Sequence, residues 1–152
     1  MKKLVLIIVT FSLATIHQFG WAQDQDTVEY YTSSPTSLLS SAVRVGNMLY
    51  LSGMMEIDPE TREMAVGAEA ETHQIMKNMK TVLETHGSSM DEVVKCTVFM
   101  TNPDDRPVIN KAYRSYFGEN PPARSGVGNL ILAGTGTVEI ECMATVGLTK
   151  VN

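Results

Sequence analysis

Two helical periodicities, separated by strand-like segments, restrict the folds open to this chain. One apolar face at 3.6-residue spacing is formed by Ile75, Met76, Met79, Val82, Leu83 and His86. A second such face is formed by Val108, Ile109, Ala112, Tyr113, Tyr116 and Phe117. Gly87 and Gly118 follow these faces and supply the expected helix ends. Helices that alternate with strands predict an α/β (α+β) fold with a mixed sheet.

The segments around the helices are rich in β-branched and apolar residues, which favours strands. After a short edge strand at Val28–Thr32, the order is β-β-α-β-α-β-β, with strands predicted at Ala42–Val45, Met48–Gly53, Val93–Met100, Ala123–Val127 and Val138–Val146. Two helices can cover one face of such a sheet. The other face must pack elsewhere, so we expect the chain to self-associate.

The first 22 residues have the pattern of a Sec signal peptide. Lys2 and Lys3 precede a short apolar run, and Gly20-Trp21-Ala22 offers small residues for cleavage after Ala22. An uncleaved anchor is the alternative, but polar residues and a glycine interrupt the apolar run. We therefore expect a periplasmic or secreted protein in which residues 23–152 form a single domain with its core at about 28–150.

The charge of the chain argues against nucleic-acid binding. The full chain carries 12 basic and 17 acidic residues, a net charge of −5. Removal of Lys2 and Lys3 leaves ten basic residues against 17 acidic ones, a charge of −7. No basic stripe is present to hold a phosphate backbone. After cleavage of residues 1–22, we expect no membrane segment.

The two cysteines, Cys96 and Cys142, both lie inside predicted strands. Export would permit a disulfide between them. A bridge also requires a suitable Cα separation, which the sequence does not provide. We therefore expect two buried free thiols.

Most familiar catalytic motifs are absent from the sequence. It contains no GxSxG, no HExxH, no metal-spaced His/Cys cluster and no phosphate-binding loop; Gly134-Thr135-Gly136 predicts a turn. The predicted mature chain has two histidines, His73 and His86, which we place on a helix flank and at a helix end. We therefore expect no histidine-activated nucleophile, no metal and no cofactor.

Three charged residues remain as candidates. Arg124 lies among small residues in PPARSGVG, and alternation places Glu139 and Glu141 on one face of their strand. From spacing, a structural ion pair with Arg124 ranks first and a solvated acidic face second. The third interpretation is a site in which Arg124 holds an anion and Glu139 handles water or protons.

The chain from about Ala42 to Leu148 resembles the Rid/YjgF family of reactive intermediate/imine deaminases. The order and spacing of several segments together carry this resemblance: Val45–Gly53, Val94–Met100, Val108–Tyr113, Tyr116-Phe117, Pro122–Ser125 and Val138–Glu141. The resemblance implies a chorismate-mutase-like fold assembled as a homotrimer. Its sheets would form a central barrel with three clefts between subunits.

The resemblance also implies a site. The carboxylate-binding arginine of the family falls on Arg124 and its water-handling glutamate on Glu139. A guanidinium can grip a carboxylate with two parallel hydrogen bonds. Other cleft positions of the family fall on Ser52, Gly53, Asn110 and Gly126. Gly126 stands where cysteine is common, which is compatible with a backbone role.

The implied reaction is hydrolysis of 2-imino acids, or their enamine tautomers, to 2-keto acids and ammonium. The sequence departs from the family at Leu39, where the family has a cleft tyrosine, and the segment Gly128–Gly136 is more apolar than usual. Leu39 and the export signal motivate an alternative, a non-catalytic trimer that binds small carboxylates or a partner. A ribonuclease, an activity sometimes attached to the family, fits the acidic chain poorly.

Overall fold

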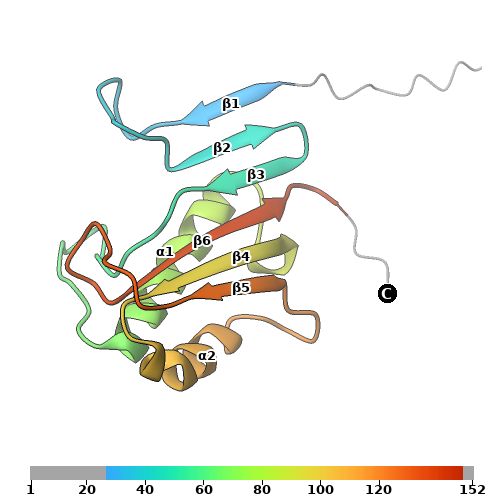
Figure 1. Ribbon diagram of the computed structural model, residues 1–152. Coiled ribbons are helices and arrows are strands. Elements are labelled where there is room, and N and C mark those ends of the chain that lie inside the picture. The colour runs from blue at the N-terminus through green and yellow to red at the C-terminus, as the bar shows by residue number, and fades with distance from the viewer. Residues whose placement is uncertain (1–26, 149–152) are drawn as a thin grey trace, which may run out of the picture.

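A six-stranded mixed sheet with two helices on one face forms the fold (Figure 1). The structure, a computed structural model, describes residues 27–148, so the predicted signal peptide lies outside the described residues. The strands are β1 (Val28–Tyr31), β2 (Ala42–Val45), β3 (Met48–Leu51), β4 (Val93–Met100), β5 (Ala123–Val127) and β6 (Val138–Thr145). Their order in the sheet is β1-β2-β3-β6-β4-β5. The predicted mixed fold and the short edge strand are confirmed.

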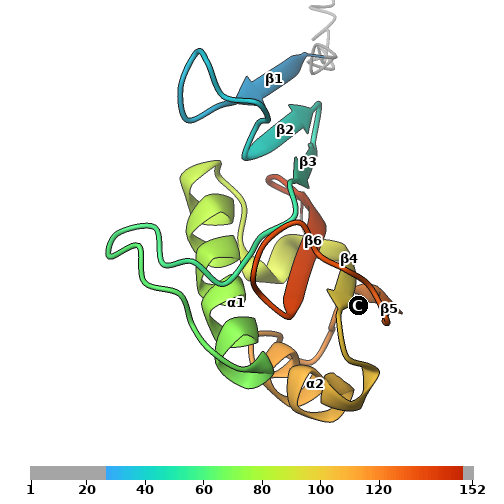
Figure 2. The same ribbon diagram turned by 60° about the vertical axis from the view of Figure 1, so that its left-hand side comes forward.

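The two helices lie on the same side of the sheet, as Figure 2 shows. They are α1 (Ala68–Thr85) and α2 (Arg106–Arg114), and short 3-10 turns precede β4 and α2. The sheet face beneath them is the core face: along β4 and β6, Cys96, Val98, Ile140 and Cys142 are buried. Side chains on the opposite face alternate with these, so the predicted uncovered face is present.

Gly87 ends α1 as predicted. Its φ of 78° lies in the left-handed region, which glycine adopts without a steric cost. The amide of Gly87 donates to Glu84 O and the amide of Ser88 donates to Leu83 O, which together form a Schellman motif. The second helix differs from the prediction, because α2 ends at Arg114 and Val108 is 38% exposed rather than part of the buried face.

The two histidines join elements of the fold, as expected for a helix flank and a helix end. His73 lies 3.1 Å from the hydroxyl of Tyr116 and links α1 to the segment after α2. His86 stacks on Tyr31 with ring centroids 3.8 Å apart, which packs β1 against the end of α1. Burial lowers the pKa of His86, so the neutral ring is favoured in this stack.

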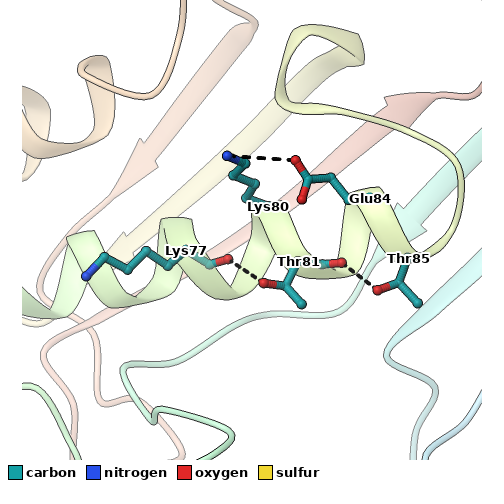
Figure 3. A network of polar contacts seen from close by, with 5 residues as sticks. All are labelled: Lys77, Lys80, Thr81, Glu84 and Thr85. Carbon is teal, nitrogen blue, oxygen red and sulfur yellow. Dashed lines mark hydrogen bonds and ion pairs between the residues drawn. The ribbon is translucent and has the colours of Figure 1, made fainter.

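The outer face of α1 is polar and locally bonded (Figure 3). The hydroxyls of Thr81 and Thr85 donate to the carbonyls of Lys77 and Thr81, at 3.2 and 2.7 Å. Lys80 and Glu84 form an exposed i,i+4 ion pair at 3.8 Å. Exposed pairs of this kind contribute little to stability, so packing of the opposite face holds α1 in place.

Cys96 and Cys142 form a disulfide, so the prediction of free thiols is wrong. The antiparallel register of β4 and β6 places the two residues directly opposite each other, with Cα atoms 4.1 Å apart. Both side chains are buried. The sequence predicted both strands but did not give their relative register, and the register is what makes the bridge geometrically accessible.

Two buried glutamates near the start of β6 have opposite surroundings. The carboxylate of Glu71 accepts hydrogen bonds from the amides of Gly67, Thr137 and Val138 and from the Thr137 hydroxyl, at 2.6–3.2 Å. Glu56 is 1% exposed, and neither of its carboxylate oxygens has a hydrogen-bond partner among residues 27–148. The Glu71 carboxylate organises the loop before β6, whereas the buried Glu56 carboxylate has no compensating hydrogen bond from this part of the chain.

We expect the same substitution at these two positions to change stability in opposite directions. Glu71→Met leaves several donors unsatisfied and should lower the free energy of unfolding by about 3 kcal/mol. Glu56→Met replaces an uncompensated carboxylate with an apolar side chain of similar length and should raise it by about 1–3 kcal/mol. Urea unfolding of both variants measures the difference. A loss of stability in Glu56→Met would show that Glu56 is bonded in solution.

Candidate functional site

Arg124 lies on β5 at an edge of the sheet, and α2 orients its side chain. The Nη2 atom of Arg124 donates a hydrogen bond of 2.6 Å to Asn110 Oδ1. The guanidinium carbon lies 4.9 Å from the ring centroid of Tyr113, within the range of a cation–π contact. Asn110 and Tyr113 are three residues apart and therefore share a face of α2. The exposed guanidinium is thus held from two sides.

Tyr113 is a site residue that the sequence indicated only as a member of a helix face. Its side chain is 4% exposed, and its hydroxyl has no hydrogen-bond partner within the described chain. Burial raises the pKa of Tyr113 to about 12, and the nearby charge of Arg124 opposes part of that rise. The ring therefore remains neutral and serves Arg124 as an aromatic platform. In the sequence, the three-residue spacing between Asn110 and Tyr113 was the one signal that could have placed Tyr113 beside the candidate residue Asn110.

A hollow of about 360 Å³ lies beside Arg124, and we call it the arginine hollow. It is lined by Met100, Pro103, Arg106, Asn110, Arg124, Gly126, Gly128 and Asn129. Two arginines and no acid line it, so it favours an anion. Gly126 is exposed, and a Cβ there would meet its nearest neighbour, Met100, at 3.8 Å. The structure thus brings three predicted residues together: Arg124, Asn110 and Gly126.

Glu139 lies on β6 and belongs to a second group of predicted residues. Its carboxylate lies against the backbone of Gly53, because a Cβ at that glycine would overlap Glu139 Oε1. Ser52 precedes Gly53 and donates from its hydroxyl to Ser40 O at 2.6 Å. That bond ties the loop carrying Leu39 to the end of β3. Glycine at position 53 is therefore what allows the carboxylate to sit here.

The second group borders a groove of about 520 Å³ that we call the apolar groove. Its lining residues are Leu39, Ser41, Ser52, Gly53, Met54, Met55, Ile57, Pro59, Arg62, Asn78, Thr81 and Val82. The structure thus brings Leu39, Ser52 and Gly53 together, with Glu139 against Gly53. Leu39 is 62% exposed, so its side chain is available to a ligand.

The predicted structural ion pair between Arg124 and the glutamates of β6 is wrong for a single chain. Arg124 is in register with Cys96, and its side chain turns toward α2 on the core face. Glu139 is in register with Phe99 and alternates with the buried Ile140, so it lies on the other face. Ion pairs within the described residues are Lys80–Glu84 and Lys111–Glu69.

Neither a metal cluster nor a membrane span was found within residues 27–148. No group of three or more His, Cys, Asp or Glu side chains is placed to hold a metal ion in this part of the chain. No helix in the same range is long and apolar enough to cross a bilayer.

Comparisons with known proteins identify relatives of this fold. A family model described as Endoribonuclease L-PSP matches residues 32–146. A 2-iminobutanoate/2-iminopropanoate deaminase from Dermatophagoides farinae is 40% identical over 113 residues, which cover 74% of this chain and 88% of the relative. The human protein of the same name is 35% identical over 109 residues, covering 71% and 80%.

A solved structure agrees with these matches. RidA from an Antarctic Psychrobacter superposes with a TM-score of 0.70 at 36% identity, covering 74% of this chain and 92% of that one. The family match spans most of the chain, including β2 to β6 and both helices. The chain therefore belongs to the Endoribonuclease L-PSP family, which is the Rid/YjgF family of reactive intermediate deaminases.

Proposed function

We propose that this protein is a homotrimeric deaminase that hydrolyses 2-imino acids to 2-keto acids and ammonium. One observation carries the proposal: the chain presents an anion-binding half-site around Arg124 and a carboxylate half-site around Glu139 on opposite sheet faces. Neither half is complete alone. Association of copies would place the arginine hollow of one against the apolar groove of the next, and relatives named as deaminases support this chemistry.

Exposed apolar residues on the open sheet face support the association. Tyr50, Val127 and Met143 are each about 40% exposed there, at 41%, 40% and 38%. Burial of such a surface between copies is favourable by roughly 25 cal/mol per Å². A closed ring uses the same pair of surfaces at every interface, which fits two different half-sites on one chain.

Arg124 would bind and orient the substrate. Its guanidinium can form two parallel hydrogen bonds with the α-carboxylate, while Asn110 and Tyr113 keep the side chain in place. Fixing the carboxylate fixes the imine carbon relative to Glu139 of the neighbouring copy. Such positioning turns attack by water into an effectively unimolecular step.

Glu139 would handle the water. Its carboxylate accepts a proton as the water oxygen bonds to the imine carbon, and the C=N electrons move to nitrogen. Glu139 then returns its proton to the amine nitrogen of the carbinolamine, and the C–N bond breaks. The hydroxyl oxygen becomes the keto oxygen, and its proton passes through Glu139 to the departing ammonia, which leaves the glutamate ionised again. The iminium form and one water thus give the keto acid and ammonium, with no net gain or loss of protons. No oxidant or reductant is consumed.

A non-catalytic trimer that binds small carboxylates is the second candidate. Leu39 favours it, because an aliphatic side chain supplies no hydroxyl at a position where the resemblance places a tyrosine. In this case a keto acid would bind at Arg124 and no imine would be consumed. The acidic chain continues to argue against a ribonuclease.

The test is an imine-consumption assay with the protein from Gln23 onward. An amino-acid oxidase generates 2-imino acids, and semicarbazide traps those that survive, so faster hydrolysis lowers the trapped yield. We expect the protein to lower this yield and Glu139→Gln to restore it. Binding of a keto acid without any loss of imine would instead establish the binding trimer.

We also propose export from the cytoplasm. The signal-peptide pattern of residues 1–22 is the motivating feature, and the Cys96–Cys142 disulfide supports an oxidising compartment. N-terminal sequencing of the protein recovered from its native host should begin at Gln23. Recovery with residues 1–22 still attached in the cytoplasmic fraction would contradict the proposal.

A further inference from the structure

We propose that the apolar groove receives the substrate side chain and makes the enzyme prefer 2-imino acids with long, unbranched apolar side chains. This inference rests on the proposed function and adds a substrate class to it. The groove takes apolar side chains from three parts of the chain. They are Leu39 from the β1–β2 loop, Met54, Met55, Ile57 and Pro59 from the segment after β3, and Val82 from α1.

The groove shares Gly53 with the proposed reaction site. Gly53 lines its edge, and the carboxylate of Glu139 rests on Gly53. A substrate whose imine carbon faced the water on Glu139 would have its side chain at this edge. Side chains of one or two carbons would leave most of the groove of about 520 Å³ unfilled. Longer apolar chains would bury more surface and gain binding free energy.

The backbone of the groove is fixed, whereas its lining can adapt. Met54 exchanges two backbone hydrogen bonds with Ile140 of β6, at 2.9 and 3.1 Å. The side-chain amide of Asn78 on α1 donates to the carbonyls of Met55 and Ile57, at 3.2 and 2.8 Å. Methionine side chains are flexible and polarizable, so they suit a slender alkyl or thioether chain.

The charge of the lining also favours an apolar occupant. Arg62 is the one ionisable side chain among the groove residues described, and it is exposed. The backbone of Arg62 is fixed by a turn, in which the amide of Arg62 donates a hydrogen bond of 3.0 Å to Asp58 O. Asn110 and Tyr113 hold the guanidinium of Arg124, whereas no side chain within residues 27–148 holds that of Arg62, so we expect Arg62 to contribute less to binding a second carboxylate. The alternative, an acidic side chain bound at Arg62, is a distinguishable outcome of the test.

The experiment compares three imino acids, generated by amino-acid oxidases from norleucine, alanine and glutamate. The measured quantity is the ratio of kcat/KM values from the semicarbazide assay. We expect norleucine to exceed alanine by about tenfold or more, because each buried methylene increases discrimination. Leu39→Asn should lower this ratio several-fold. Leu38→Asn is the matched control, because Leu38 is 99% exposed and lies outside the groove lining, and it should leave the ratio unchanged.

The possible outcomes distinguish a failure of the predicted side-chain preference from a failure of imine hydrolysis itself. Equal kcat/KM values for norleucine and alanine, or a preference for glutamate, would overturn the inference and leave imine hydrolysis intact. The same holds if Leu38→Asn lowers the ratio as much as Leu39→Asn does. If a folded trimer hydrolyses none of the three imino acids, both the proposed function and this inference are contradicted.

Discussion

Arg124→Ala should lower kcat/KM for imine hydrolysis by at least about a hundredfold, since truncating one partner of a hydrogen-bonded charge pair costs several kcal/mol. The residue is exposed and its contacts are with Asn110 and Tyr113, so the variant should fold and associate normally. The semicarbazide assay gives the rate, and thermal unfolding checks the fold.

Two further variants separate geometry from charge. Arg124→Lys keeps the charge but loses the planar fork, so we expect a loss of about tenfold or more. Arg106→Ala removes the other arginine that lines the arginine hollow. We expect a loss of less than about tenfold, since a cation that acts only through the electrostatic field of the hollow contributes less than a bidentate contact. If all three variants lost activity equally, the hollow would attract anions without a specific grip by Arg124.

Loss of the Cys96–Cys142 disulfide should be the largest single change in stability. The bridge closes a separation of 46 residues, and the chain-entropy relation gives about 4 kcal/mol for a loop of that length. Both side chains are buried, so the bond resists reduction in the folded state. When the reductant has cleaved the bridge, the denaturant concentration at the midpoint of unfolding should be much lower than for the oxidised protein.

The double variant Cys96→Ala, Cys142→Ala is the control for this prediction. It should unfold at a lower denaturant concentration than the oxidised protein, and a reductant should not change its midpoint. If protein purified without reductant showed two free thiols by mass spectrometry, and its midpoint did not change with reductant, the disulfide would be contradicted and the proposal of export would lose this support.

Local patterns predicted the elements well. The bounds of β2, β4 and β5 agree with the predicted strands, because alternation and turn residues at these positions are local signals. Gly87 ended α1 as expected because a left-handed residue is needed there. The end of α2 was less well predicted, since aromatic residues after Arg114 continue the apolar pattern without continuing the helix.

The pairing register of the strands could not be predicted from the sequence. The disulfide depends on Cys96 facing Cys142 across β4 and β6, which only the register decides. The same is true of Arg124 and Glu139, whose separation by the sheet follows from their registers with Cys96 and Phe99. The role of Tyr113 required the position of β5 beside α2. Candidate residues could thus be named from the sequence, but their grouping into two half-sites could not.

We propose that each active site combines Arg124 of one copy with Glu139 of another. Arg124→Ala and Glu139→Gln chains, each inactive alone, can be co-expressed with different tags and purified for trimers that contain both. In a closed ring, every such mixed trimer has one interface with both residues intact, so we expect about one third of the wild-type rate per trimer. A folded mixed trimer with no activity above either parent would contradict the claim and place the working residues within a single chain.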